Sequence, residues 1–272
     1  MKQLYESLIA QTDKRFTWLI VDDGSTDNTE KIVKEFKKGI LDVKYIKQKN
    51  SGKHVAFNKA IKECKSELLI CVDSDDYLLK DSVERIILNY VKIKDNNEIA
   101  GMAGICIDKN HNLLGGYFPK ENLLSDTMEI RDKYNLPGEP EIYKTDILKN
   151  YSFEIFENEK FITEAVLFDK LTSKFKLMYI NEILMVKEYL IGGLTDNQLK
   201  IRIDNIKGTK FYYKQRIKLS KYKKAKFKAS INYCRFCLHD KNLRECFVSS
   251  NKILMIFSLP FAVSIFIKDK IY

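Results

Sequence analysis

Short acidic sequences that directly follow apolar runs are the residues of this chain best suited to chemistry. The apolar run 68–72 ends abruptly in the sequence Asp-Ser-Asp-Asp at 73–76. An apolar run without polar alternation predicts a strand buried on both faces. Carboxylates at the end of such a strand are costly unless a cation neutralises them. Their oxygens suit Mg²⁺ or Mn²⁺, ions that commonly also hold substrate phosphates. An acidic turn that only caps the following helix, through Asp76 or Asp81, is the alternative.

A second acidic pair follows an earlier apolar run. The sequence FTWLIV predicts a strand, and Asp22 and Asp23 come directly after it. The order strand-helix repeats along the first third of the chain with short links, which predicts an α/β fold with a mostly parallel, doubly wound sheet and flanking helices. The carboxyl ends of parallel strands lie at one edge of the sheet, where ligands bind. We therefore expect Asp22 and Asp23 to share one crevice with Asp73 and Asp75.

Two carboxylate pairs around one divalent metal indicate a site for a nucleoside diphosphate. One carboxylate can accept a hydrogen bond from a base or a ribose hydroxyl, while another holds the metal on the phosphates. Lys53 is expected in a loop at the same edge, where it would meet phosphate as a point charge. A solvated loop lysine is the alternative for Lys53. The neighbouring His54 is interpreted as a helix N-terminal residue without a charge role.

Three motifs occur in order along the chain: VDDGSTDNT, NSGKHVAFNKAI and LLICVDSDDYL. Together they resemble the nucleotide-binding half of family 2 glycosyltransferases, which have the Rossmann-like GT-A fold, over roughly residues 4 to 190. The resemblance implies a nucleotide-sugar donor, commonly a UDP-sugar, and Mn²⁺ or Mg²⁺ held by an Asp-X-Asp motif. That motif falls on Asp73, near the ribose and the metal, and Asp75, a metal ligand. Asp23 matches the nucleobase contact, with Asp22 beside it, and Lys53 is assigned to the nucleotide.

The resemblance also implies a general base. Glu164, in the sequence FITEA, occupies its place and resembles the acidic motif of the bacterial polysaccharide-biosynthesis branch of the family. An inverting transfer needs a carboxylate opposite the leaving diphosphate to take the proton of the acceptor hydroxyl. Glu157 and Glu159 are close rivals. The alternative is that Glu164 only lies in the first turn of its helix, where the dipole favours a carboxylate.

The N-terminus departs from the family pattern. The family normally begins with a strand in the middle of the sheet, and this chain starts in the helix that should follow it. Unpaired backbone is therefore expected beside residues 16–21. We expect an N-terminally truncated piece whose true start lies upstream; a protein that folds with a gap and binds the donor poorly is the alternative. The GT-A domain is expected at residues 1–195 and a basic helical tail at 196–272.

The positive charge of the chain is concentrated in this tail. Residues 200–235 carry thirteen Lys or Arg and one acid, a net of +12, which leaves −2 of the total +10 for all other residues. This distribution argues against a protein that coats nucleic acid and favours a local surface that meets an anionic partner. Nucleic-acid binding through residues 221–228, KYKKAKFK, is an alternative that nothing else in the sequence supports.

The tail also has apolar features. Phe227, Ile231, Cys234 and Leu238 fall on one helical stripe. The uncharged segment 253–267, interrupted by Pro260, has fifteen residues, fewer than the ~20 that span a bilayer. A basic amphipathic region followed by such a segment predicts a tail lying on an anionic membrane surface. A buried helix that closes the domain is the alternative. Residues 187–195 resemble the segment that closes the acceptor side in the polysaccharide branch.

The six cysteines lie far apart, which is typical of reduced thiols in a cytosolic protein. Cys71 and Cys106 are expected to be buried in strands. A structural zinc site at Cys234, Cys237, His239 and Cys246 is an alternative, but a second Cys-x-x-Cys pair is absent. The N-terminus has no apolar run of signal-peptide length.

The resemblance thus implies an inverting, metal-dependent glycosyltransferase of the hexosyltransferase type. It would move a sugar from a nucleotide-diphosphate donor to a saccharide or lipid-linked saccharide in cell-surface polysaccharide synthesis, such as that of a capsule. The expected location is cytoplasmic, peripheral on the inner face of the cell membrane, without a nucleic-acid partner. A catalytically inactive truncated relative that binds the membrane surface is the alternative.

Overall fold

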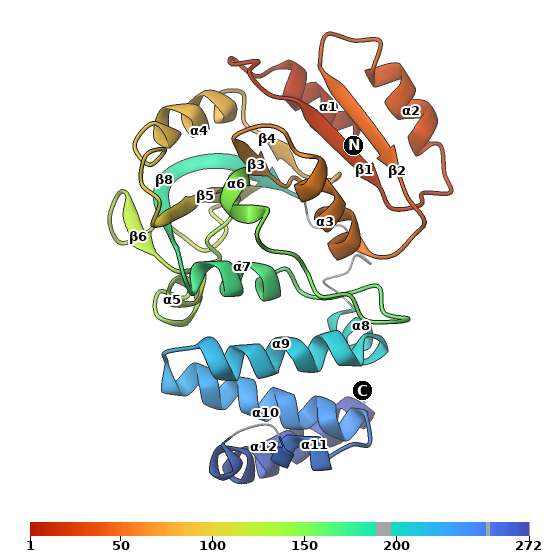
Figure 1. Ribbon diagram of the computed structural model, residues 1–272, viewed down its shortest axis with the longest axis vertical. Helices are drawn as coiled ribbons and strands as arrows, with labels where there is room; N and C mark the ends of the chain where they lie inside the picture. The colour runs from red at the N-terminus through yellow and green to blue at the C-terminus, as the bar shows by residue number, and fades with distance from the viewer. Residues whose placement is uncertain (189–196, 249–250, 272) are drawn as a thin grey trace. The chain divides into compact units, whose positions relative to one another are not determined.

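The structure is a computed structural model that describes residues 1–188, 197–248 and 251–271. The chain divides into two compact units, the first formed by residues 1–152 and 168–190 and the second by residues 153–167 and 191–272. Figure 1 labels most of the helices and strands. Most of the segment expected to close the acceptor side, residues 189–195, lies outside the described residues.

The N-terminal part of the first unit is a two-stranded parallel sheet with helices around it. Its elements are α1 (Lys2–Ile9), β1 (Trp18–Asp22), α2 (Thr29–Phe36), β2 (Val43–Lys47) and α3 (Lys53–Glu63). The ring of Tyr5 in α1 stacks on Phe36 of α2 at a centroid distance of 4.0 Å, and Trp18 of β1 lies 5.5 Å from Phe36. These three rings hold both helices against β1.

The larger sheet of the first unit has the strand order β3-β7-β5-β8-β4, with β6 paired to β8. Its strands are β3 (Leu68–Ile70), β4 (Tyr77–Leu78), β5 (Ile99–Asp108), β6 (Leu123–Ser125), β7 (Glu141–Lys144) and β8 (Lys176–Lys187). The long central strands β5 and β8 are parallel, and β7, β6 and β4 run antiparallel to their neighbours. Strand β5 is buried almost throughout, as a central strand covered on both faces should be. The helices are α4 (Ser82–Tyr90), α5 (Thr127–Asp132), α6 (Thr145–Leu148) and, from Phe168 on, α7 (Ala165–Thr172), whose first three residues are counted with the second unit.

The expected α/β class with flanking and C-terminal helices is confirmed, but two details of the sheet are wrong. Among the described residues, β1 pairs with β2 alone and β3 with β7 alone, so the two acidic strand ends belong to separate sheets. Strand β3 stops at Ile70 and is half-buried, and Cys71 is exposed. The reason is that β3 has a neighbouring strand on one side only. That a strand precedes α1 stays a prediction.

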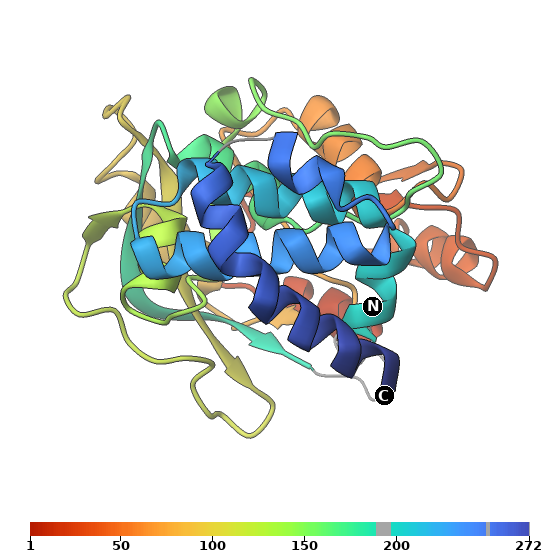
Figure 2. The ribbon, with the colours of Figure 1, turned by 90° about the horizontal axis from the view of Figure 1, so that it is seen from below.

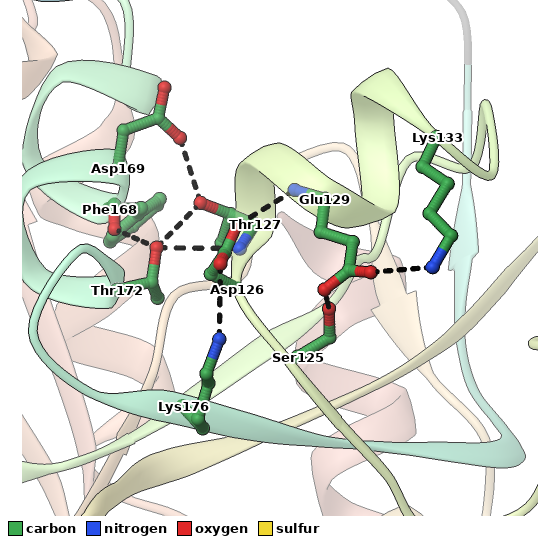
Figure 3. Close-up of polar contacts among 9 residues, drawn as sticks. All are labelled: Ser125, Asp126, Thr127, Glu129, Lys133, Phe168, Asp169, Thr172 and Lys176. Atoms are coloured by element: carbon green, nitrogen blue, oxygen red, sulfur yellow. Dashed lines mark hydrogen bonds and ion pairs between the residues drawn. The ribbon is translucent and has the colours of Figure 1, made fainter. Parts of the chain in front are cut away.

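A polar network fixes the start of α5 in the first unit (Figure 3). The buried Asp126 carboxylate accepts the backbone N–H of Glu129 at 2.8 Å and so caps α5. Lys176 of β8 pairs with the same carboxylate at 3.1 Å. The Glu129 side chain in turn accepts a hydrogen bond from Ser125 at 2.9 Å and pairs with Lys133 at 2.8 Å.

The same network joins α5 to the end of α7. The Thr127 hydroxyl donates to Asp169 at 2.8 Å and lies 2.8 Å from the Thr172 hydroxyl (Figure 3). Arg131 forms an ion pair with Asp169, whose side chain is fully buried. A buried carboxylate requires such partners. The network therefore fixes α5 to the C-terminal part of α7.

The second unit is helical. Its helices are α8 (Gln198–Asp204), α9 (Ile206–Leu219), α10 (Lys223–His239), α11 (Arg244–Val248) and α12 (Lys252–Ile271). Helix α10 packs against both α9 and α12, and Figure 2 shows α12, in dark blue, crossing α10. Cys234 on the predicted stripe is fully buried, and Ile231 and Leu238 pack against the same core. None of the helices in the described part of the chain is long and apolar enough to cross a membrane.

All six cysteines are free of disulfides. Cys106 is buried, as expected, whereas Cys71 is exposed because β3 ends before it. Cys234, Cys237 and Cys246 are fully buried in the core of the second unit. Within the described ranges, the structure contains no group of three or more His, Cys, Asp or Glu side chains arranged to hold a metal, so it gives no support to a zinc site at these cysteines.

Candidate functional site

Asp23 anchors the loop that follows β2. Its carboxylate accepts hydrogen bonds from Gln48 Nε2 at 2.8 Å and from the backbone N–H groups of Ser51 at 2.9 Å and Gly52 at 2.7 Å. Gly52 adopts φ +100, a conformation that favours glycine, directly before α3. The carboxylate assigned to the nucleobase by resemblance therefore also fixes the loop that leads into α3.

Asp22 is held inside the turn after β1. Its buried carboxylate accepts hydrogen bonds from the Tyr45 hydroxyl at 2.5 Å and from Ser25 N–H at 2.7 Å. Burial alone would raise the pKa of Asp22, but these hydrogen bonds outweigh it and the pKa is lowered. In the same turn Gly24 has φ +80, and a Cβ there would lie 2.6 Å from the backbone nitrogen of Asn50. Only glycine allows the two loops to approach this closely.

Lys53 connects the two acidic strand ends. Its Nζ lies 2.5 Å from Oδ1 of Asp73, and both side chains are 47% exposed. Lys53 is the first residue of α3 and Gly52 its N-cap, so the lysine does not lie in a loop as expected. Because Gly52 binds Asp23 and Lys53 binds Asp73, the start of α3 joins the ends of β1 and β3. The structure thus brings Asp23, Lys53 and Asp73 together, although their strands lie in different sheets. His54 is buried in the first turn of α3.

The acidic turn after β3 contains both accessible and buried carboxyls. Asp73 is exposed, Asp75 is half-buried and Asp76 is 6% exposed. Burial raises the pKa of Asp76 to about 6, and the charges of Asp73 and Asp75 add to the increase. Asp76 accepts the backbone N–H of Glu188 at 3.1 Å. A capping role for Asp76 is therefore not what the structure shows.

Asp81, the other residue considered as a cap, lies at the N-cap position of α4 but its side chain makes no capping hydrogen bond. Its carboxylate instead accepts Arg85 Nε at 2.8 Å. Asp73 pairs with Lys53 and Asp76 accepts Glu188 N–H, so these two carboxyls do not cap α4.

Sequence reasoning missed an ion pair beside the acidic turn. Lys187, at the end of β8, pairs with Glu139, and its charge lowers the pKa of Asp76. Although burial lowers the pKa of Lys187, the neighbouring Glu139 raises it, so the ammonium stays charged. Lys187 is the first residue of the segment 187–195 singled out in the sequence, but nothing there indicates Glu139 as its partner; the pairing of β8 with β5 and β4 brings Lys187 to this place.

Glu164 belongs to the second unit, whereas the acidic strand ends belong to the first. It is half-buried and comes one residue before α7 rather than within its first turn, with its carbonyl accepting Leu167 N–H at 3.0 Å. The rival Glu159 binds the N–H groups of Lys207 at 2.7 Å and Gly208 at 2.8 Å at the start of α9. Glu159 is therefore engaged in fixing a helix start, and the base role of Glu164 stays a prediction.

The 73–76 turn fits a divalent metal by the chemistry of its donors. Asp73 and Asp75 offer hard carboxylate oxygens, and Mg²⁺ or Mn²⁺ is usually bound through one or two carboxylates together with substrate phosphates. Over residues 1–188, 197–248 and 251–271 there is no preformed cluster of three candidate ligands.

The sequence matches the family described as Glycosyl transferase family 2 over residues 1–145. This match includes more than half of the chain, and the chain belongs to glycosyl transferase family 2. The resemblance inferred from the three motifs is thereby confirmed.

Individual relatives agree with this assignment. The glycosyltransferase GlyA of Streptococcus pneumoniae serotype 4 is 27% identical over 214 residues, which cover 72% of this chain and 29% of that protein. The chondroitin synthase of Escherichia coli is 40% identical over 79 residues, 29% of this chain and 12% of the synthase. The chain therefore spans less than a third of the length of either protein.

Solved structures share the fold. The crystal structure of S. aureus TarS has a TM-score of 0.61 at 18% identity and covers 87% of this chain and 41% of TarS. A structure of TarS 1-349 in complex with UDP-GlcNAc has a TM-score of 0.57 at 18% identity and covers 98% of this chain and 76% of that one. The GT-A fold is thus confirmed for this chain.

Proposed function

We propose that this chain binds a nucleotide-sugar donor, a UDP-sugar, and transfers the sugar with inversion to a saccharide hydroxyl. The observation that carries the proposal is the loop in which Gly52 binds Asp23 and Lys53 binds Asp73. This loop gathers two carboxylates and a lysine at one place, the groups that a nucleoside diphosphate requires. The UDP-GlcNAc complex of TarS, a protein of the same fold, supports the donor class.

Each residue of the loop would have a separate task. Asp23 would accept a hydrogen bond from the base and Asp73 from the ribose, while Asp22 would hold the turn. Lys53 would leave Asp73 to meet the diphosphate. The diphosphate carries more negative charge than one carboxylate and so attracts the ammonium more strongly. Asp75, with Asp73, would hold Mn²⁺ or Mg²⁺. When bound, the metal would stabilise negative charge on the leaving diphosphate.

Glu164 is proposed as the general base. Its carboxylate would take the proton of the acceptor hydroxyl while that oxygen bonds to the anomeric carbon and the bond to the diphosphate oxygen breaks. The rival Glu159 holds the start of α9 through the N–H groups of Lys207 and Gly208. In Glu164→Gln we expect transfer to fall strongly with UDP binding unchanged; near-normal turnover with intact binding would refute this role.

The acceptor class is proposed to be a saccharide or a lipid-linked saccharide, in cell-surface polysaccharide synthesis at the inner face of the cell membrane. Support comes from the net charge of +12 in residues 200–235, which suits an anionic surface. The alternative, a catalytically inactive relative that binds the membrane surface, would show neither hydrolysis nor transfer of a nucleotide sugar.

A thermal-shift panel of nucleotide sugars tests the donor proposal. We expect UDP and UDP-sugars with Mn²⁺ to raise the unfolding temperature of the chain. Asp75→Asn should lose this response, whereas Asp95→Asn, at an exposed acid in the same unit, should keep it. No shift with any nucleotide sugar and Mn²⁺ would contradict donor binding by this chain.

A further inference from the structure

Helix α12 presents large apolar side chains to solvent. The exposed fractions of these side chains lie between 53% and 70%. Their spacing places them on one face of the helix. The residues of this outer stripe are Ile253, Ile256, Phe257, Phe261, Ile267 and Ile271.

The opposite face of α12 is fixed on α10. Met255, Ser258 and Ala262 are fully buried, the Ser258 hydroxyl lies 2.6 Å from that of Ser230, and Met255 Sδ lies 3.7 Å from Cys234 Sγ. These contacts determine which way the outer stripe points. A surface helix normally carries polar side chains on its outer face, so a continuous apolar stripe indicates a binding surface.

Positive charge borders the outer stripe at both ends of α12. Lys252, Lys268 and Lys270 are exposed. Asp269 is the one acid in this helix, and it is bound by Arg235 at 2.5 Å and by His239 at 2.8 Å. The charge of Asp269 is therefore already balanced inside the second unit, and the exposed charges of α12 are positive.

The lysine-rich start of α10 reaches the same surface. The Phe227 ring meets the ring of Phe261 at 5.6 Å, edge to face. Lys223 and Lys224 are exposed and precede Phe227 by four and three residues, so they lie on its side of α10. Residues 221–235 contain no acid. Lysines thus flank the middle of the outer stripe as well as its ends.

We propose that the outer stripe of α12 docks on a bilayer containing anionic phospholipid. The helix would lie in the plane of the interface, with Phe257 and Phe261 in the acyl boundary and the lysines on the headgroup phosphates. A second copy of this chain is a poorer occupant, because a symmetric contact would bring these lysines together without acids to meet them. The proposal gives the expected membrane location a defined surface, and it holds whether or not sugar transfer occurs.

Vesicle sedimentation of the full chain, without nucleotide, tests the proposal. We expect binding to phosphatidylcholine vesicles containing phosphatidylglycerol, weaker binding at high salt, and little binding to phosphatidylcholine alone. F257S/F261S should reduce partitioning about tenfold or more, since each ring loses its burial. The matched control L88S/V91S changes two apolar residues of α4 and its C-cap that are 62% and 59% exposed, and it should bind like the parent.

A fluorescent reporter gives an independent measurement. Trp18 is the one tryptophan of the chain, so in a W18F background F257W supplies a single emitter on the outer stripe. Its emission should shift to the blue with anionic vesicles, and that of W18F/L88W should not. Equal binding of F257S/F261S and the parent overturns the proposal. So does a dimer, found by light scattering, that F257S/F261S abolishes while vesicles bind neither protein.

Discussion

The Lys53 ammonium, at the first residue of α3, lies 2.5 Å from a carboxylate oxygen of Asp73, twenty positions further along the chain in the turn after β3. Gly52, the residue before Lys53, donates its N–H to Asp23. Asp23, after β1, and Asp73, after β3, are therefore joined through the N-cap and the first residue of α3. The donor site that we propose is built on this link.

Replacing Lys53 tests its assignment to the diphosphate. In Lys53→Met we expect UDP to bind about tenfold or more weakly, because one charge-assisted contact is lost, while uridine binds unchanged. Titration calorimetry with both ligands measures the ratio of the UDP affinity to the uridine affinity. Lys49→Met, at an exposed lysine of the same loop, is the control and should leave the ratio as it is. Equal losses of affinity for UDP and uridine would mean that Lys53 supports the folded structure rather than binding the phosphates.

Asp23 is predicted to matter for stability as well as for the donor. Asp23→Ala leaves the donors of Gln48, Ser51 and Gly52 without their acceptor and should lower the free energy of unfolding by about 1 to 3 kcal/mol. Asp27→Ala, which removes bonds to Thr29 in an exposed turn, should cost less. Denaturant unfolding compares the two. If Asp23→Ala were as stable as the parent, the carboxylate would not be anchoring the loop.

The network of Figure 3 makes a separate stability prediction. Thr127→Val removes the hydroxyl that donates to the fully buried Asp169, and should cost about 1 to 3 kcal/mol. Thr12→Val, which removes an exposed bond to Glu84, should change stability by less than about 0.5 kcal/mol. Chemical denaturation of both variants checks this. Similar effects in the two variants would argue against a locking role for the network.

The environment of Asp269 leads us to predict that the stability of the second unit depends on pH. Burial would raise its pKa, but the hydrogen bonds of Arg235 and His239 lower it, so the folded pKa lies below the unfolded one. The ionised carboxylate therefore stabilises the fold at neutral pH, and this contribution is lost as pH falls through the folded pKa. Asp269→Asn should be less stable than the parent at pH 7 by about 1 to 3 kcal/mol.

The difference between Asp269→Asn and the parent should shrink as the pH falls below about 4, where the unfolded carboxyl is protonated. Thermal unfolding followed by circular dichroism over a pH series measures it. Lys270→Gln, at the exposed neighbouring residue, serves as the control. A difference that stays constant down to the acid limit would mean that the charge of Asp269 is not what stabilises the fold.

The sequence was informative where the chemistry is local. The positions of Asp23 and Asp73 after strands could be predicted, because an acid that directly follows an apolar run is visible in the local sequence. The burial of Leu68 could not, because it depends on which strands lie beside β3, and the structure has a neighbour on one side alone. Lys187 and Glu139 were missed because they meet beside Asp76 only through the pairing of distant strands.

The C-terminal apolar run illustrates a second limit. A segment that is apolar on all sides has no periodicity, so the sequence could not decide between a buried helix and a membrane-facing one. In the structure α12 has one buried face and one exposed face: Met255 and Ala262 are fully buried, while Phe257 is 67% exposed. Contacts with α10, rather than composition, decide which face is which.

Retention of Mn²⁺ tests the central claim, that the acidic turn at 73–76 and the loop at 52–53 form one metal-dependent nucleotide site. Electron paramagnetic resonance follows the signal of free Mn²⁺ as the chain and UDP are added. We predict that the signal falls when both are present, well below its level with either alone, and that it does not fall for Asp75→Asn. A signal that UDP leaves unchanged, or an equal fall for Asp75→Asn, would contradict the account.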